Sequence, residues 1–303
     1  MGHINLKIMI KWFTIFLSII QIGCSKVIEI DMGNTKALVL NSIFNPDSLF
    51  TFRISPTASL LNNYDTLNDY LHISLYEENK LIFDSVSQSS IFKIDLKPIC
   101  RKNYSVELKS DNFPPIKASD TIPNLVPIDN AYMIFPAGVD AFGFYKAEAY
   151  ISFTDPPDVT NYYELLISSK PGGTNAWYSD YETNDPVLMN EGDQDYHPNS
   201  FFFSDDLFKG ESYTIKIKHD VGYSQNGKIF KVFPLYATLR SISRTYYKYR
   251  KYYTRHAHNQ QFQNEFLDLI FKGEPQNMFT NVENGFGIFA GYCETTSQII
   301  HYE

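Results

Sequence analysis

Hydrophobic and polar residues alternate with a period of two in many short segments of this chain. In chain order the segments predicted as strands, several of which show this alternation, are residues 37–43, 49–55 (LFTFRIS), 71–76 (LHISLY), 81–86, 91–96, 104–108, 144–153 (FYKAEAYISF), 162–167 and 213–218 (YTIKIK). This period is typical of strands with one buried face. The polar tetrad EENK at 77–80 separates two of the segments and predicts a hairpin turn. The chain is therefore predicted to be mainly β.

The spacing of these segments predicts two domains. Residues 36–125 contain short strands without a long helical period, which indicates an immunoglobulin-like β-sandwich. Residues 126–303 are predicted to form a larger β domain with one inserted α-helix. The segment 171–199 within it is rich in Gly, Asn, Asp and Pro. A connection this long is either functional or disordered, and we expect a functional loop.

The inserted helix is predicted at about residues 241–271, which contain helix formers and neither Gly nor Pro. Helical spacing places two sets of side chains on separate faces: Tyr246, Tyr249 and Tyr253 on one, and Lys248, Lys251 and Arg255 on the other. Interleaved tyrosines and cations also occur in platforms that bind single-stranded nucleic acid. We favour tyrosines that pack on a sheet and cations that remain solvated.

The N-terminus has the order of a secretory signal. Basic Lys7 and Lys11 accompany an apolar run from Ile8 to Ile22, which is too short and too interrupted for a spanning anchor. The run ends at Gly23-Cys24, which resembles the lipobox of bacterial lipoproteins. We therefore expect a signal peptide at 1–23, an acylated Cys24 and a lipid-anchored linker at 24–35. A plain secreted protein with an incidental cysteine is the alternative.

The acidic composition of the chain argues against two classes of partner. Removing residues 1–23 removes two of the 26 basic residues and none of the 34 acidic ones, which leaves a net charge of −10. Such an excess of acid argues against nucleic acid and anionic lipid as non-specific partners.

Beyond Cys24 the sequence contains two further cysteines, Cys100 and Cys293. They could form a disulfide outside the cytoplasm, but we expect buried thiols and leave the pairing open.

Catalytic and metal motifs are missing from the sequence. It contains no Gly-x-Ser-x-Gly elbow, no phosphate-binding glycine loop with lysine and no His-Glu-x-x-His pair. Residues 191–195 (EGDQD) offer oxygen ligands for Ca²⁺, but an acidic solvated turn is the favoured interpretation. We expect no cofactor, no metal and no catalytic residue. Paired carboxylates for glycoside cleavage stay open, because the fold sets their separation.

Residues 281–289 (NVENGFGIF) predict a turn into a closing strand. Asn284, Gly285 and Gly287 tolerate positive φ. Phe286, Ile288 and Phe289 are expected to be buried there.

An ordered set of landmarks resembles one uncharacterised family. The landmarks are residues 120–123 (DTIP), 155–156 (DP), 161–165 (NYYEL), 203–210 (FSDDLFKG), 239–249 (LRSISRTYYKY), 274–275 (EP) and 281–289. Together they resemble the Bacteroidetes lipoproteins of domain-of-unknown-function family 4249, over nearly all of the mature chain. The resemblance implies an outer-membrane lipoprotein associated with TonB-dependent receptors. It carries no catalytic residues.

The expected function is therefore non-catalytic. We expect an accessory component of a TonB-dependent uptake system that binds a small ligand or glycan, or the receptor barrel itself. Exposed aromatics on a long loop stack well on sugars and partner surfaces, so Trp177, Tyr178 and Tyr181 are the candidate contacts. The protein is expected in the outer membrane, anchored through Cys24 and facing the cell surface, with a periplasmic orientation as the alternative. A structural or adhesive surface protein and a hydrolase are the other functions considered.

Overall fold

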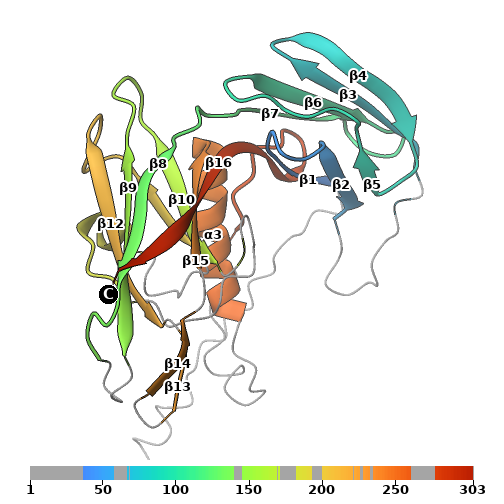
Figure 1. Ribbon diagram of the computed structural model, residues 1–303. Coiled ribbons are helices and arrows are strands. Elements are labelled where there is room, and N and C mark those ends of the chain that lie inside the picture. The colour runs from blue at the N-terminus through green and yellow to red at the C-terminus, as the bar shows by residue number, and fades with distance from the viewer. Residues whose placement is uncertain are drawn as a thin grey trace, which may run out of the picture. The chain divides into compact units, whose positions relative to one another are not determined.

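The computed structural model describes most of the chain after residue 36. The described residues are 37–57, 67, 69–139, 145–168, 170, 182–192, 200–220, 222–225, 228–232, 235–260 and 277–302. Residues 36–303 form one compact unit (Figure 1). Strands predominate in it and helices are few, so the expectation of a mainly β chain with a sandwich and an inserted helix is confirmed.

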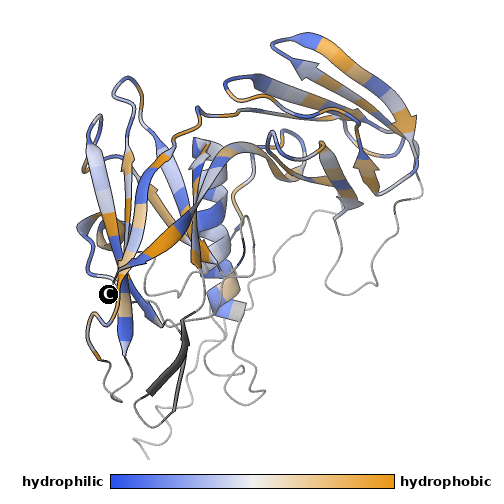
Figure 2. Ribbon diagram, in the orientation of Figure 1, coloured by the Kyte–Doolittle hydropathy of each residue, from blue (hydrophilic) through white to orange (hydrophobic). Residues whose placement is uncertain are grey.

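The N-terminal strands form a sandwich. One layer is an antiparallel sheet in the order β4-β3-β6-β7, and the other contains β1, β2 and β5. The strands are β1 (Leu38–Phe44), β2 (Thr51–Pro56), β3 (Leu71–Glu77), β4 (Lys80–Ser87), β5 (Ile91–Lys93), β6 (Asn103–Lys109) and β7 (Ile116–Thr121). Alternate residues of both layers face one apolar core, which includes Leu40, Phe52, Ile73 and Val106. The alternation is visible along the strands in Figure 2.

The predicted hairpin between β3 and β4 is confirmed. The two strands pair antiparallel, with Glu77 opposite Lys80. Glu78 and Asn79 lie between them with φ values of 48° and 68°. Positive φ at both central positions is the geometry of a tight hairpin turn that matches the twist of the strands.

A second set of strands forms the larger part of the unit. It comprises β8 (Ile128–Ile134), β9 (Lys146–Thr154), β10 (Tyr162–Ser168), β11 (Phe201–Ser204), β12 (Ser212–Asp220) and β15 (Leu235–Ile242), with a separate hairpin of β13 (Gly222–Gln225) and β14 (Lys228–Val232). Strand β9 pairs with β8 on one side and β12 on the other, and β10 pairs likewise with β11 and β15. Inward residues of both groups share one core, in which Phe153, Tyr163, Phe203 and Phe208 contact each other.

The last strand, β16 (Phe286–Tyr302), joins both sets of strands. Its first part pairs parallel to β1, its middle pairs antiparallel to β15, and its end pairs parallel to β8 (Figure 1). The boundary predicted near residue 125 falls between β7 and β8, and β16 pairs with strands on both sides of it. The C-terminal segment therefore completes the N-terminal sandwich.

The turn before β16 agrees with its sequence except at Phe286. Asn284 and Gly287 have positive φ (58° and 105°), and a Cβ on Gly287 would lie 2.0 Å from the Leu40 carbonyl oxygen. Ile288 and Phe289 are buried, but Phe286 is 54% exposed, so its expected burial is wrong. Phe286 is the first residue of β16, whereas Ile288 belongs to the cluster that packs under α3.

The inserted helix α3 spans Arg244–Gln260 and contacts β10, β11 and β16. It begins later than predicted, because Ser241 and Ile242 still pair with β16 at the end of β15. The Ser243 hydroxyl accepts a hydrogen bond from the Tyr246 backbone N–H at 3.0 Å, as a helix N-cap residue does. The predicted part beyond Gln260 lies outside the described residues up to residue 276.

Candidate functional site

The residues that the sequence singled out for function lie outside the described residues. This holds for the acylation candidate Cys24 and for the contact candidates Trp177, Tyr178 and Tyr181. The notable chemistry of the described part lies between α3 and the sheet beneath it.

Four charged side chains, two of them buried and two partly buried, meet under α3. Glu164 projects from β10, Arg240 from β15, Glu294 from β16 and Arg250 from α3, and we call these four residues the α3 charge cluster. Arg240 donates to Glu164 Oε2 at 2.9 Å and to Glu294 Oε2 at 2.8 Å. Arg250 Nη2 lies 3.3 Å from Glu164 Oε1. Two acids and two bases therefore balance in a site where the Glu164 side chain is only 1% exposed.

Two neutral hydroxyl groups also donate hydrogen bonds to the Glu164 carboxylate. The Ser200 hydroxyl donates to Oε1 at 2.7 Å, and the Tyr246 hydroxyl donates to Oε2 at 3.1 Å. Burial alone would raise the pKa of Glu164, but Arg250 and Arg240 outweigh it and hold that pKa below its usual value. Burial also raises the pKa of Tyr246. The carboxylate is thus ionised at neutral pH and both of its oxygens accept hydrogen bonds, which suits a structural ion network better than a proton-transfer site.

A second buried carboxylate joins α2 (Pro186–Asn190) to α3. Glu191 accepts the backbone N–H of Ser204 at 2.8 Å, Lys251 Nζ at 2.7 Å and the Tyr247 hydroxyl. Glu191 is 9% exposed, so the expectation of a solvated acidic turn is wrong at this residue. Lys251, expected to be solvated, is one of its partners. Asp193 and the residues after it to 199 lie outside the described residues.

The aromatic face of α3 is only partly as predicted. Tyr246 is buried, but Tyr253 is 43% exposed, so packing of all three predicted tyrosines on the sheet is wrong. Tyr249 stacks on Tyr253 with 6.1 Å between ring centroids. Lys248 lies 5.7 Å from the ring centroid of Phe279. The described residues contain no group of three or more His, Cys, Asp or Glu side chains placed to hold a metal ion.

A third polar centre lies at the N-terminus of α3. Asp120, at the end of β7, accepts the backbone N–H of Gly291 in β16 at 2.8 Å. Burial raises its pKa to about 6, although hydrogen bonds from the Ser243 side chain and the Gly291 backbone oppose the shift. The N-terminal end of a helix favours a negative charge. Asp120 therefore links the N-terminal sandwich to the helix start.

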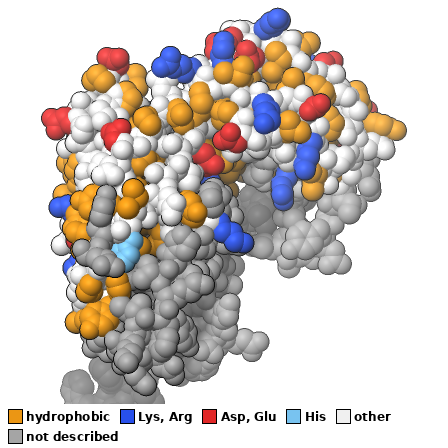
Figure 3. Space-filling view, viewed as in Figure 1, with side chains coloured by type: hydrophobic (Ala, Val, Ile, Leu, Met, Phe, Trp, Pro, Cys, Tyr) orange, Lys and Arg blue, Asp and Glu red, His pale blue; other side chains and the backbone are white. Residues whose placement is uncertain are grey.

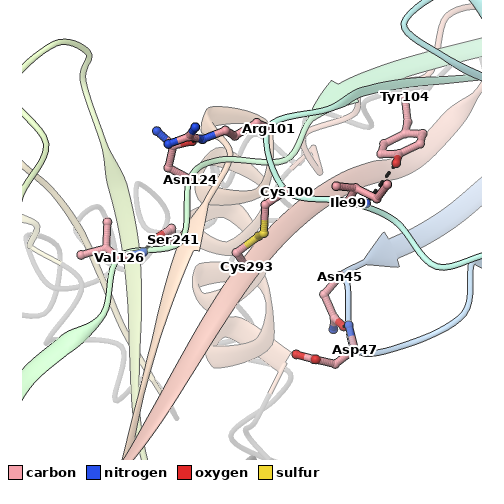
Figure 4. Close-up of a disulfide and its surroundings, with 10 residues drawn as sticks. All are labelled: Asn45, Asp47, Ile99, Cys100, Arg101, Tyr104, Asn124, Val126, Ser241 and Cys293. Atoms are coloured by element: carbon pink, nitrogen blue, oxygen red, sulfur yellow. Dashed lines mark hydrogen bonds between the residues drawn. A yellow bond between two sulfur atoms is a disulfide. The ribbon is translucent and has the colours of Figure 1, made fainter.

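A disulfide lies close to the same junction. Cys100 and Cys293 are bonded, with their Cα atoms 6.4 Å apart (Figure 4). Cys100 lies just before β6 and Cys293 lies in β16, beside Glu294. The sequence favoured buried thiols, and that expectation is wrong. Close by, the Ser241 hydroxyl accepts the Val126 backbone N–H at 3.2 Å, at the start of the second set of strands.

The same kind of anchoring recurs in the loop before β10. Asp155 accepts the Tyr163 hydroxyl, and it also accepts the Gly210 backbone N–H at 2.8 Å. Asp205 accepts the Asn161 backbone N–H at 2.8 Å. These residues belong to the landmark segments 155–156, 161–165 and 203–210. The ordered landmarks of the sequence therefore coincide with the buried polar contacts that fix its loops and strands.

A family model described as "Domain of unknown function (DUF4249)" matches residues 25–298. The chain belongs to this family. No curated protein matches the sequence of this chain. In this DUF4249 chain the charge cluster, the Asp120 contact and the disulfide all join segments that are far apart in sequence.

Sequence reasoning missed the α3 charge cluster. Glu164 stands inside the apolar strand YYELLI, and Arg240 is the only charge in β15 (LYATLRSI). A charge within an otherwise buried strand is costly unless it is paired, so each was a signal of a buried partner. The sequence did not indicate which residues would pair with Glu164 and Arg240.

Among the described residues, no helix is long and apolar enough to cross a membrane.

Proposed function

We propose that this DUF4249 protein is an outer-membrane lipoprotein of a Bacteroidetes bacterium. In this proposal Cys24 carries the acyl chains, and the folded part acts without catalysis as an accessory component of a TonB-dependent uptake system. The observation that carries the proposal is the N-terminal order of basic residues, an apolar run and Gly23-Cys24. Each buried CH₂ of an acyl chain contributes about 0.8 kcal/mol, so several chains anchor a soluble body firmly.

The disulfide supports export independently of the leader. Disulfides form and persist in oxidising compartments and are rare in the bacterial cytosol. The bond between Cys100 and Cys293 joins residues 193 positions apart. A folded exported domain with such a bond fits the proposed location.

The chemistry under α3 supports a binding role over a hydrolytic one. A hydrolase needs carboxylates that reach substrate, whereas both oxygens of Glu164 are occupied by protein donors in a buried site. The landmark residues build the frame, so recognition is assigned to surface loops. Trp177, Tyr178 and Tyr181 remain the proposed contacts for a small ligand, a glycan or the receptor barrel.

The anchor is tested by mass spectrometry and membrane fractionation of the protein from its host. The native chain is expected to begin at a triacylated or diacylated Cys24 and to sediment with the outer membrane. Cys24→Ser should release the protein into soluble fractions, and the neighbouring Ser25→Ala should not. An unmodified Cys24, or an intact leader ahead of it, would contradict the proposal.

The uptake role is tested by affinity purification from solubilised outer membranes. Recovery together with a TonB-dependent receptor barrel is expected. Trp177→Ala should weaken co-purification or glycan retention, while Tyr70→Ala, at a tyrosine that is 63% exposed in another part of the chain, should not. Repeated recovery of the anchored protein without any barrel would favour the adhesive or structural alternative.

A further inference from the structure

The five strands that end the two large sheets differ in how their edges are protected. These strands are β4 and β7 in the four-stranded sheet and β5, β11 and β12 in the other. An edge strand exposes unpaired N–H and C=O groups, and proteins usually cover or interrupt such edges. The β5 edge is only three residues long.

Three of the other four edges are covered by specific contacts. On β7, Lys117 exchanges two backbone hydrogen bonds with Glu283, at 3.4 and 2.8 Å. On β12, Lys218 exchanges two backbone hydrogen bonds with Glu182, at 2.9 and 2.8 Å. The Asp185 carboxylate accepts the backbone N–H of Lys216 on the same strand. On β11, the Glu191 carboxylate accepts the Ser204 N–H.

The β4 edge has no such cover among the described residues. β4 spans Lys80–Ser87 and pairs only with β3. In an antiparallel ladder every second residue of an edge strand directs its N–H and C=O outward, so about four residues of β4 present a free ladder. Apart from the ladder with β3, the described residues make no hydrogen bond to the backbone of residues 80–86.

Apolar side chains are exposed along this same edge. Leu81 is 49% and Val86 is 60% exposed on β4, and on β5, an end strand of the other sheet, Ile91 is 51% exposed. Contact between Phe83 and Phe92 joins the two strands, with ring centroids 5.5 Å apart. In Figure 3 apolar side chains reach the surface at the end of the sandwich where Figure 1 places β4 and β5.

The charge on β4 decides what kind of strand fits. Asp84 lies on the same sheet face as Leu81 and Val86, since these residues pair with Ser74, Tyr76 and His72 of β3. The side chain of Asp84 is 46% exposed. Hydrogen bonds from Ser74 and His72 lower its pKa, so it is ionised at neutral pH.

A second copy of β4 is a poor partner for this edge. Lys80 is the only cation of β4 and lies on the opposite face, because it pairs with Glu77. An antiparallel copy would place Asp84 against Asp84 or against an apolar residue. Like charges directly opposite each other are destabilising.

We propose that the β4 edge is a docking site for an extended peptide segment of another protein, which adds as a strand and places a Lys or Arg opposite Asp84 between apolar residues. The backbone ladder supplies the hydrogen bonds, and the alternate side chains supply the specificity. The residues of this edge are not those assigned to ligand contact in the proposed function, and the inference holds whether or not the protein serves an uptake receptor.

The test uses two fluorescein-labelled, capped peptides and the full-length protein. The first peptide, Thr-Val-Thr-Lys-Thr-Val-Thr, matches the edge, and the second has Glu in place of Lys. Saturable binding of the Lys peptide in fluorescence polarisation is expected, with hydrogen-exchange protection of β4. The Glu peptide should bind about fivefold more weakly, as expected for exchanging an attractive cross-strand pair for a repulsive one.

Three variants make the test decisive. Asp84→Lys should reverse the preference between the two peptides, and Val86→Lys should abolish binding of both. Val159→Lys, a matched change at a residue 57% exposed elsewhere, should bind like the unaltered protein. Circular dichroism must show that each variant is fully folded at the temperature of the binding assay. Absence of saturable binding, an unchanged preference in Asp84→Lys, or equal loss in Val159→Lys would overturn the proposal.

Discussion

The buried charge cluster under α3 gives the sharpest expectation for stability. Replacing Glu164 by Gln leaves Arg240 and Arg250 without their shared counter-charge, 2.9 and 3.3 Å away. Removing one partner of a buried ion pair costs about 3–5 kcal/mol because it leaves a buried charge uncompensated. Here Arg240 keeps Glu294 at 2.8 Å and Arg250 is partly exposed, so we place the loss at the lower end, about 3 kcal/mol. We expect Glu164→Gln to lower the free energy of unfolding by about this amount, which is a large part of the stability of an ordinary domain.

The measurement is urea-induced unfolding at pH 7, followed by fluorescence and circular dichroism. Glu107→Gln is the matched control. It removes a partner 2.5 Å from Lys117, but the side chains of this pair are 25% and 56% exposed. An exposed pair contributes about 0–1 kcal/mol and weakens with salt, whereas the Glu164 effect should be nearly independent of salt.

The pH dependence follows from the lowered pKa of Glu164. A carboxylate with a lower pKa in the folded state stabilises that state above its unfolded pKa, and this stabilisation is lost as the pH falls through the folded pKa. The difference between wild type and Glu164→Gln should thus persist at neutral pH and shrink only under acid. Equal losses for Glu164→Gln and Glu107→Gln would refute the assignment of a buried, charge-balanced network.

Three further expectations concern the junction around β16. Cys293→Ser should lower the free energy of unfolding by about 5 kcal/mol on the chain-entropy model for so long a loop, and reductant should reproduce this loss in calorimetry of the wild type but not of the variant. Because the pKa of Asp120 is raised to about 6, its contribution is fully present below its ordinary value and is lost as pH rises through 6. Wild type should gain about 2 kcal/mol relative to Asp120→Asn between pH 7 and pH 4, and equal pH profiles in urea unfolding would contradict this. Gly287→Ala should prevent soluble expression or folding, since its Cβ would lie 2.0 Å from the Leu40 carbonyl oxygen, whereas Gly192→Ala, with φ +68° and open space, should cost only about 1–2 kcal/mol in the same assay.

The local pattern of the sequence was enough for much of the fold. Segments such as LHISLY and YTIKIK alternate because one face of each strand meets a core, and the structure places strands at both. The tetrad EENK predicted the β3–β4 hairpin through its turn residues alone. The helix was recognisable from its composition, but its start was not, because pairing of Ser241 and Ile242 with β16 overrode helix propensity.

The candidate site depended on contacts that the sequence does not encode locally. Glu164 and Arg240 are 76 residues apart, and Cys100 and Cys293 are 193 apart. Glu164 faces Arg240 because β10 pairs with β15 in a register that places the two residues opposite each other, and Cys293 is brought to the N-terminal strands by the pairing of β16 with β1. Glu191 is a further example. Its acidic sequence context predicts a solvated turn, and only the fold brings Lys251 and the Ser204 backbone N–H to its carboxylate.

The sequence by itself determined what short-range physics controls: the period of the strands, the turn at 77–80, the presence of one long helix and the export-like leader. The tertiary structure alone decided which charges are buried, that the two cysteines pair and which strand edge lacks a covering contact from the described residues. Side-chain periodicity depends on neighbours a few residues away. Burial and pairing depend on which distant segments the chain brings together.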